Sequence, residues 1–256
     1  MWHSDRMLQS VTDSNGEFRR VIGKNRVVIT GLGVLAANGI GKEAFWNSLL
    51  AGESGIGPIT LFDASGLSCR IGGEVPGFDP KDFFEPRQKA KRMGRFSQLA
   101  LVAAKEAVSD AGFSMEFLKT IPQLPIVLGV STTAMDLRAE PATSYSAVTG
   151  IPNAASSTIA YTYGLNARIQ TVSNGCASSL DAVTVAFDMV RNKKSDIAIV
   201  GGSDSTITEY VFQCMCKSRK VSTQNEDPKH ACKPFDLRRD GGVAAEGAGL
   251  IIIESL

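Results

Sequence analysis

Short apolar runs that alternate with helical segments constrain this chain most strongly. Each run has the length and the Val/Ile content of a buried strand. The stretches between the runs show the three-to-four-residue spacing of apolar side chains that is typical of helices. Because parallel neighbours need crossover helices, the alternation predicts an α/β fold with a mainly parallel five-stranded sheet covered by helices on both faces. The predicted strands are 26–30, 125–130, 169–173, 196–202 and 248–254.

The chain divides into a leader and one domain. Residues 1–25 have no apolar segment of the kind found in targeting peptides, and acidic side chains interrupt them. We expect this part to be a disordered leader, followed by a single domain over residues 26–256. Within the domain, the predicted helices are 42–51, 86–111, 153–163, 176–191 and 204–217.

The composition excludes several classes of function. Twenty-seven basic and 26 acidic residues leave a net charge of +1, so nothing points to nucleic acid or a membrane surface as a partner. No apolar stretch approaches the roughly 20 residues that span a bilayer. The 5 cysteines are odd in number and irregularly spaced. This argues against a disulfide framework and favours a reducing, cytoplasmic location.

One cysteine occupies a position that suits catalysis. In TVSNGCASSLDAV, Cys176 follows a strand pattern and an Asn-Gly pair, and it precedes a helix pattern. Asn174-Gly175 permits a sharp turn, and a thiol at a helix N-terminus meets free N–H groups that favour the thiolate. The Cys176 N–H can then serve as an oxyanion donor. Most free cysteines are instead small buried apolar residues, and the local pattern leaves both interpretations open.

Other motifs are weaker. GLGVLAANG at 31–39 follows a strand but lacks the G-x-G-x-x-G spacing, so a tight strand-to-loop turn is a better interpretation than a dinucleotide site. The charged start of the 86–111 helix suits either a solvated face or a dock for an acidic partner. We expect no metal and no organic cofactor. The residues that come nearest to a metal cluster match no standard zinc spacing; they are Cys214, Cys216, His230 and Cys232.

Five stretches, taken in order, are similar to those of a known family. They are VVITGLGVLAANGIG at 27–41, RQKAKRMGRFSQLALVAAKEAVSDAGF at 87–113, SNGCASSLDAV at 173–183, DIAIVGGSD at 196–204 and KPFDLRRDGGVAAEGAGLIIIESL at 233–256. With them, the chain from residue 26 onward resembles the N-terminal half of a β-ketoacyl-acyl carrier protein synthase, a condensing enzyme of fatty-acid and polyketide biosynthesis. NGCASSLDAV is more similar to the ketosynthases of bacterial type II polyketide systems than to the fatty-acid enzyme.

The resemblance implies a thiolase-like fold, of which this chain supplies the N-terminal of two similar halves. It implies an acyltransferase in which Cys176 accepts an acyl group from acyl carrier protein. Malonyl-carrier protein then loses CO2, and its carbanion attacks the thioester. The family's carrier-protein dock falls on Lys91 and Arg92, with Lys89 and Arg95 nearby. The implied partners are acyl carrier protein and either a second copy of the chain or a second ketosynthase half or subunit.

The chain departs from the family pattern in ways that bear on activity. Decarboxylation in the family uses two histidines of the second half. The 2 histidines here are His3, in the leader, and His230, which we expect to be a surface residue. The stretch 129–163 is shorter than in the family, and Gly242 and Ala245 stand where the family has a bulkier residue and a glycine. We therefore expect an enzyme that is incomplete as this single chain. The alternative is a catalytically inactive truncated or split product that binds carrier protein or a partner half.

The predicted helix that begins at Cys176 is apolar on more than one side. One face carries Cys176, Leu180, Val183, Phe187 and Val190. Half of a two-half fold would leave part of such a helix uncovered. We expect the isolated chain to self-associate or dissolve poorly through this surface.

Overall fold

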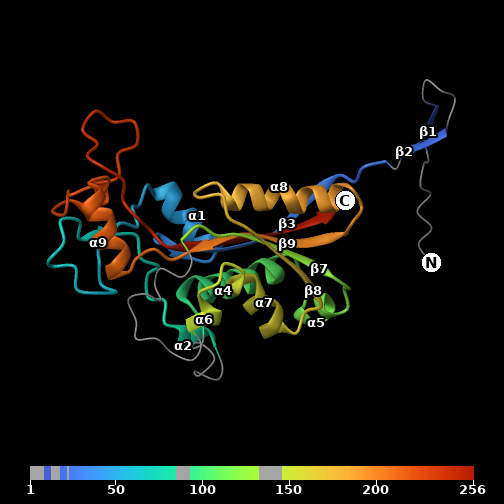
Figure 1. Ribbon diagram of the computed structural model, residues 1–256, viewed down its shortest axis with the longest axis horizontal. Helices are drawn as coiled ribbons and strands as arrows, with labels where there is room; N and C mark the ends of the chain where they lie inside the picture. Colours follow the sequence, from blue (N-terminus) through green and yellow to red (C-terminus); the bar gives the residue numbers. More distant parts are fainter. Residues whose placement is uncertain (1–8, 13–17, 22, 85–92, 133–145) are drawn as a thin grey trace.

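A mixed sheet of six strands forms the centre of the protein, with helices on both of its faces (Figure 1). The computed structural model describes residues 9–12, 18–21, 23–84, 93–132 and 146–256. In spatial order, the strands of this sheet are β4 (Gly39–Ile40), β3 (Val27–Ala36), β10 (Gly247–Ser255), β9 (Ile197–Asp204), β7 (Leu124–Gly129) and β8 (Ala167–Val172). Two small sheets pair β1 (Gln9–Thr12) with β2 (Phe18–Val21) and β5 (Gly57–Pro58) with β6 (Ile71–Gly72). The helices are α1 (Lys42–Ala51), α2 (Pro80–Phe83), α4 (Arg95–Asp110), α5 (Met115–Lys119), α6 (Ser146–Thr149), α7 (Ala154–Tyr163), α8 (Ser178–Arg191), α9 (Glu209–Ser218) and the 3-10 turn η2 (Pro228–His230).

The predicted α/β class is confirmed, and the sheet is mixed, with six strands instead of five. β7 pairs in parallel with β8 and β9, whereas β10 runs antiparallel to both of its neighbours, β9 and β3. The chain leaves β9 and returns into β10 at the same end of the sheet, where Asp204 pairs with Gly247. Without a crossover between them, the two strands must be antiparallel. The spacing of apolar runs does not show at which end of a sheet a connection returns, so the sequence analysis missed this.

The larger core lies between one face of the sheet and the helices α4 and α7. Leu99, Ala103 and Ala107 of α4 are fully buried, and α4 lies so close to β3 that only glycine fits beneath it. A Cβ on Gly31 would lie 2.1 Å from the carbonyl oxygen of Ala107, and one on Gly33 would lie 2.0 Å from that of Ala103. Gly31 and Gly33 therefore lie inside a strand and admit a helix, and the turn that we expected for the 31–39 motif comes only at its end, between β3 and β4.

The opposite face of the sheet is only partly covered. α8 packs on β7 and β9 through small side chains such as Ala182 and Ala186. Leu180, expected on the buried face of α8, is instead 71% exposed. At the N-terminal part of the helix the residues that face the strands are small, whereas Met189 and Val190 fill the space near its C-terminal end. On this face β3 and β10 extend beyond α8, and Ile29 and Leu32 of β3 remain exposed.

Two short strands lie in the N-terminal segment. Residues 9–12 and 18–21 form the antiparallel pair β1–β2, with Val11 opposite Arg19 and Thr12 opposite Phe18. Among the helices of the described residues, none is both long enough and apolar enough to cross a membrane.

One buried carboxylate ties the sheet to the start of α4. The Glu246 side chain has no exposed surface, and its two oxygens each accept an Arg95 guanidinium N–H, with N–O distances of 2.6 Å. It also accepts the Val75 N–H and the Ser205 hydroxyl, both at 3.0 Å. The Arg95 guanidinium in turn lies over the Phe78 ring, 5.3 Å from its centroid. A buried charge is tolerated only when it is paired and hydrogen-bonded, so these four bonds hold together segments that are far apart in sequence.

We expect Glu246→Ala to lower the free energy of unfolding by about 3–5 kcal/mol, because it leaves the Arg95 guanidinium largely buried without its partner. Glu226→Ala is the matched control. It removes a carboxylate that is 97% exposed and lies 3.6 Å from Arg70, so it should cost less than about 1 kcal/mol. Urea unfolding followed by circular dichroism measures both changes. Equal losses for the two variants would contradict the role assigned to Glu246.

Candidate functional site

Cys176 lies in a tight turn between β8 and α8. α8 begins at Ser178, so Cys176 precedes the helix instead of opening it as predicted. Gly175 has a φ of 56°, a left-handed conformation that glycine adopts without strain. The Ser178 hydroxyl closes the turn: it donates to the Gly175 carbonyl at 2.6 Å and accepts the Asn174 N–H at 2.8 Å. The Cys176 thiol is exposed, so of the two interpretations of this residue, the buried packing role does not hold.

Two glycines let α8 begin directly on the sheet. A Cβ on Gly129, the last residue of β7, would lie 2.3 Å from the backbone of Ser178. A Cβ on Gly202 of β9 would lie 1.8 Å from the Ser179 hydroxyl oxygen. This close approach fixes the first turn of α8 over the ends of two strands. It thereby fixes the turn that carries Cys176.

A cavity of about 440 Å³ opens beside Cys176. Its walls come from the segment that follows β7, the turn after β8 and the end of β9, which are the carboxyl ends of the three parallel strands. Ligands of α/β sheets bind at this edge. Met215 of α9 and the residues that lead into β10, including Ala245 and Gly247, complete the lining. The arrangement can hold a small molecule or chain end against the thiol.

Asp204 is the only ionisable side chain, apart from Cys176, among the described residues that line this cavity. Its carboxylate accepts the Ser131 N–H at 2.7 Å and the Thr132 N–H at 3.1 Å, as well as the Thr132 hydroxyl. These bonds hold the segment after β7 against the end of β9. Because both oxygens are engaged, Asp204 shapes the cavity wall. The sequence analysis did not single it out, although a polar residue directly after a buried strand is a usable signal.

The cavity lacks a histidine among the residues that the structure describes. His230 lies in η2 and is exposed, as expected, with Nδ1 2.8 Å from an oxygen of Asp227. This hydrogen bond lowers the pKa of the Asp227 carboxyl. His3 lies outside the described residues. Within the described part, no group of three or more His, Cys, Asp or Glu side chains is arranged to hold a metal, and all five cysteines are free.

Of the four predicted docking residues, the structure describes only Arg95. Lys89, Lys91 and Arg92 lie outside the described residues. Arg95 opens α4, but its guanidinium is bonded to Glu246 and only 21% of its side chain is exposed. An arginine at the start of a charged helix has the same appearance in sequence whether its partner is another protein or a carboxylate 151 positions away. The sequence analysis therefore could not separate the two roles.

The sequence analysis noted two other departures from the family pattern, the shortened stretch 129–163 and the residues at positions 242 and 245. Part of the shortened stretch, residues 133–145, lies outside the described residues. Ala245 lies in the cavity wall, facing Gly73, where an added Cβ would come within 2.7 Å of the Ala245 methyl. The absence of a side chain at Gly73 thus makes room for the methyl at position 245.

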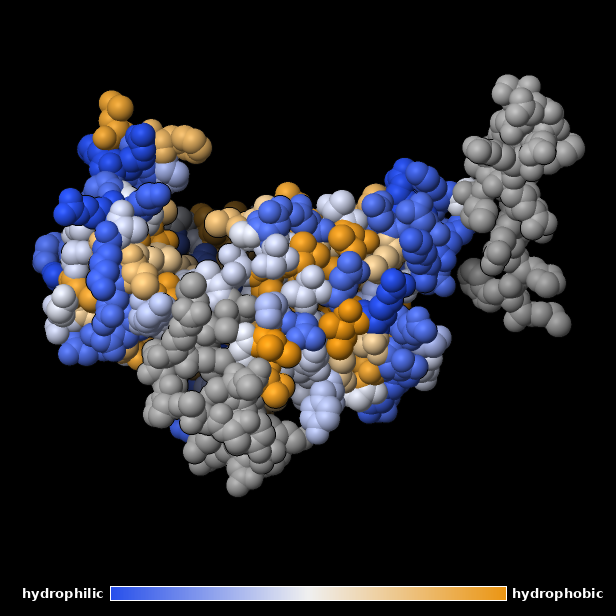
Figure 2. All heavy atoms as spheres, viewed as in Figure 1, coloured by the Kyte–Doolittle hydropathy of each residue, from blue (hydrophilic) through white to orange (hydrophobic). Residues whose placement is uncertain are grey.

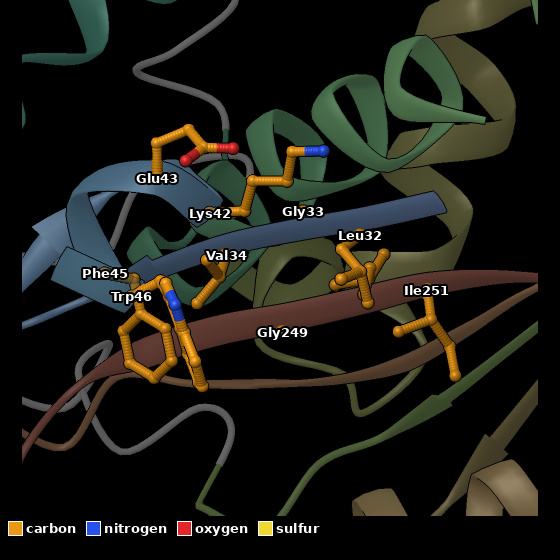
Figure 3. A pocket seen from close by; sticks show the side chains of 10 residues that line it. Leu32, Gly33, Val34, Lys42, Glu43, Phe45, Trp46, Gly249 and Ile251 are labelled. Atoms are coloured by element: carbon orange, nitrogen blue, oxygen red, sulfur yellow. The ribbon is translucent and has the colours of Figure 1, made fainter. Parts of the chain in front are cut away.

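A second hollow, of about 360 Å³, lies on the uncovered part of the sheet (Figure 3). We call it the β3–β10 groove. It is lined by Leu32 and Val34 of β3 and Ile251 of β10, with Trp46 of α1 at one end. A Cβ on Gly249 would meet nothing within 4 Å, so the middle of the groove is open. An apolar hollow of this kind suits an apolar side chain from another element.

Comparison with known proteins places the chain in a family. The family model described as "Beta-ketoacyl synthase, N-terminal domain" matches residues 24–256. The chain belongs to the β-ketoacyl synthase family. It is 35% identical over 243 residues to a 3-oxoacyl-[acyl-carrier-protein] synthase 2 from Synechocystis, and 37% identical over 251 residues to a putative polyketide beta-ketoacyl synthase 1 from Streptomyces cyaneus. These nearly equal identities do not choose between a fatty-acid and a polyketide enzyme.

Solved ketosynthase structures share the fold. A β-ketoacyl synthase from Burkholderia phymatum superposes with a TM-score of 0.79 at 28% identity, over 91% of this chain and 59% of that one. A type II polyketide synthase complex, AntDE:AntF, superposes with a TM-score of 0.74 at 27% identity, over 91% and 58%. The chain also spans 58% of each of the two relatives named above, while 91% and 90% of this chain is matched. The prediction of a thiolase-like N-terminal half is thereby confirmed.

We expect Gly129→Ala to destabilise this β-ketoacyl synthase domain by about 1–3 kcal/mol, because the new methyl meets the backbone of Ser178, which cannot rotate away. Gly249→Ala is the matched control in another strand of the same sheet. Its methyl enters open space, so the free energy of unfolding should change by less than about 0.5 kcal/mol. Urea unfolding compares the two. A Gly129→Ala variant as stable as Gly249→Ala would refute the close packing of α8 on β7.

Proposed function

We propose that this chain forms the acyl-accepting half of a β-ketoacyl-[acyl carrier protein] synthase, an acyltransferase of fatty-acid or polyketide biosynthesis. The observation that carries the proposal is the exposed Cys176 thiol, held in a preformed turn beside a cavity at the carboxyl edge of parallel strands. In the complete reaction, malonyl-carrier protein loses CO2 and the resulting carbanion attacks the acyl group on Cys176. The ketosynthase names of relatives matched over the same stretch support this proposal.

The first step is transfer of an acyl group to the thiol. Cys176 Sγ attacks the carbonyl carbon of an acyl thioester on carrier protein. A bond forms between Sγ and the carbonyl carbon, and the bond to the carrier's sulfur breaks. The proton of Cys176 ends on the released carrier thiol. The oxyanion that forms on the way needs N–H donors, and the Cys176 N–H is the donor that we assign to this chain.

The second step needs groups that the described residues of the cavity do not supply. Histidine is missing from that lining, and Asp204 is engaged by Ser131 and Thr132. We assign the donors for decarboxylation to a second ketosynthase half, located either in the same polypeptide or in a partner subunit. The same observation also favours a second candidate function. In it, the chain is a catalytically inactive truncated or split product that binds carrier protein or a partner half.

Carrier-protein docking is assigned to Lys89, Lys91 and Arg92, which precede α4. A cluster of basic side chains suits a strongly acidic carrier protein. We leave Arg95 out of the docking residues because its guanidinium is bonded to Glu246. The AntDE:AntF structure is described as an acyl-carrier protein in complex with its ketosynthase, and we propose the same class of partner for this chain.

Acyl transfer is tested by intact-mass analysis after incubation with an acyl-carrier protein. We expect the chain to gain the mass of one acyl group, and Cys176→Ser to gain none under the same conditions. Cys232→Ser is the matched control, because Cys232 is also exposed but does not line the cavity; it should acylate like the wild type. An acyl adduct that persists in Cys176→Ser would contradict the proposed role of this thiol.

Docking is tested by charge reversal. We expect Lys91→Glu combined with Arg92→Glu to weaken carrier-protein binding about tenfold or more at low salt, because attraction becomes repulsion. Added salt should reduce the difference in carrier-protein affinity between the double variant and the wild type. Lys105→Glu, an exposed lysine later in α4, controls for net charge and should bind nearly as well as the wild type. Binding measured by fluorescence anisotropy that is unchanged in the double variant would argue against docking here.

A further inference from the structure

The loop of residues 233–240 carries the two most exposed large apolar side chains among the described residues. Phe235 is 98% exposed and Leu237 is 97% exposed. Burying a Phe or Leu side chain is favourable by about 1.5–3 kcal/mol. Because both side chains are exposed, neither contributes this free energy to the stability of the chain. Phe235 also has a φ of 65°, a left-handed conformation that bulky residues rarely adopt. Single exposed apolar residues are common on protein surfaces, but two on one loop, one of them in a strained conformation, need an explanation.

The loop is already shaped before anything binds to it. Asp236 accepts the Arg238 N–H at 2.7 Å and pairs with the Arg238 guanidinium at 2.9 Å. The Arg239 guanidinium donates to the Asp236 carbonyl at 2.8 Å. At the base of the loop, the Asp240 carboxylate accepts the Thr223 N–H at 3.0 Å. A loop held in this way loses little conformational freedom on binding, so its two apolar side chains are presented ready for contact.

The loop leads directly into the wall of the candidate site. In Figure 1 it projects beyond the sheet on the side occupied by α8, and Figure 2 shows apolar atoms at its tip. The chain then runs from the loop into Ala244 and Ala245, which line the Cys176 cavity. On the α8 side of the sheet lie the exposed Leu180 and the β3–β10 groove. A body that covers α8 and the cavity would therefore meet the loop as well.

We propose that Phe235 and Leu237 are the anchors by which a second ketosynthase half is held over the Cys176 cavity. This inference rests on the proposed function. The occupant is argued from length, since the relatives and solved neighbours continue for roughly two-fifths of their length beyond the matched share. It is also argued from chemistry, since the described residues that line the cavity include no histidine to support decarboxylation. Buried apolar anchors of this kind dominate the binding energy of an interface.

The experiment measures association with a defined probe. The probe is the portion of the Synechocystis 3-oxoacyl-[acyl-carrier-protein] synthase 2 outside the matched region, co-expressed with the full chain. We expect the two polypeptides to co-purify, and Phe235→Ser combined with Leu237→Ser to weaken their association at least tenfold by analytical ultracentrifugation. Phe235→Tyr combined with Leu237→Met keeps apolar bulk at both positions and should bind within about threefold of the wild type.

Tyr161→Ser is the matched control, because Tyr161 is 87% exposed on α7, which covers the opposite face of the sheet. It should leave association unchanged. Loss of binding in Tyr161→Ser equal to that in the double serine variant would overturn the proposal, as would a wild-type chain that never binds the probe. An effect on self-association of the chain alone would overturn it in favour of a second copy as the occupant. Acylation of Cys176, read separately by mass, reports on the proposed function and should be the same in every variant.

Discussion

The carboxylate of Glu246 is the interaction on which the arrangement around the cavity depends. A carboxylate without exposed surface destabilises a protein strongly unless every oxygen is bonded. The bonds of Glu246 reach Arg95 at the start of α4, Val75 after β6 and Ser205 after β9. Glu246 itself lies between Ala245 and Gly247, which line the cavity. Separating Arg95 would leave the buried charge unpaired, and separating Val75 or Ser205 would remove one of its hydrogen bonds. The need to satisfy this carboxylate therefore fixes the cavity wall.

The position of the site follows from the mixed character of the sheet. The parallel strands β7, β8 and β9 all end at one edge, and antiparallel β10 begins there. Four chain segments therefore meet at this edge. Gly129 and Gly202 let α8 begin directly on the strands, which places the turn containing Cys176 over the same edge. A β10 that ran parallel to β9 would have required a further crossover between the two strands.

Local signals were read correctly from the sequence and distant ones were not. The helix over 42–51 and the helix that ends at Tyr163 stop at Gly52 and Gly164, whose left-handed conformation is a local property of glycine. The turn at Cys176 was predictable for the same reason. The role of Arg95 was not, because it depends on a glutamate that only the folded chain brings near. The exposure of Leu180 was also missed, because it depends on how closely α8 approaches the sheet.

An incomplete set of catalytic groups and an exposed apolar surface lie on the same side of the molecule, and binding of a second half would complete the first and cover the second. The cavity has a nucleophile but, in its described lining, no donor for decarboxylation, while α8, the β3–β10 groove and the loop of Phe235 leave apolar surface in water. In the proposed assembly, the half that buries this surface also brings the missing donors. An uncovered chain would then hold an acyl group on Cys176 without decarboxylating malonyl-carrier protein. Stability and the second chemical step would depend on the same interface, so malonyl groups would be consumed only where both halves are joined.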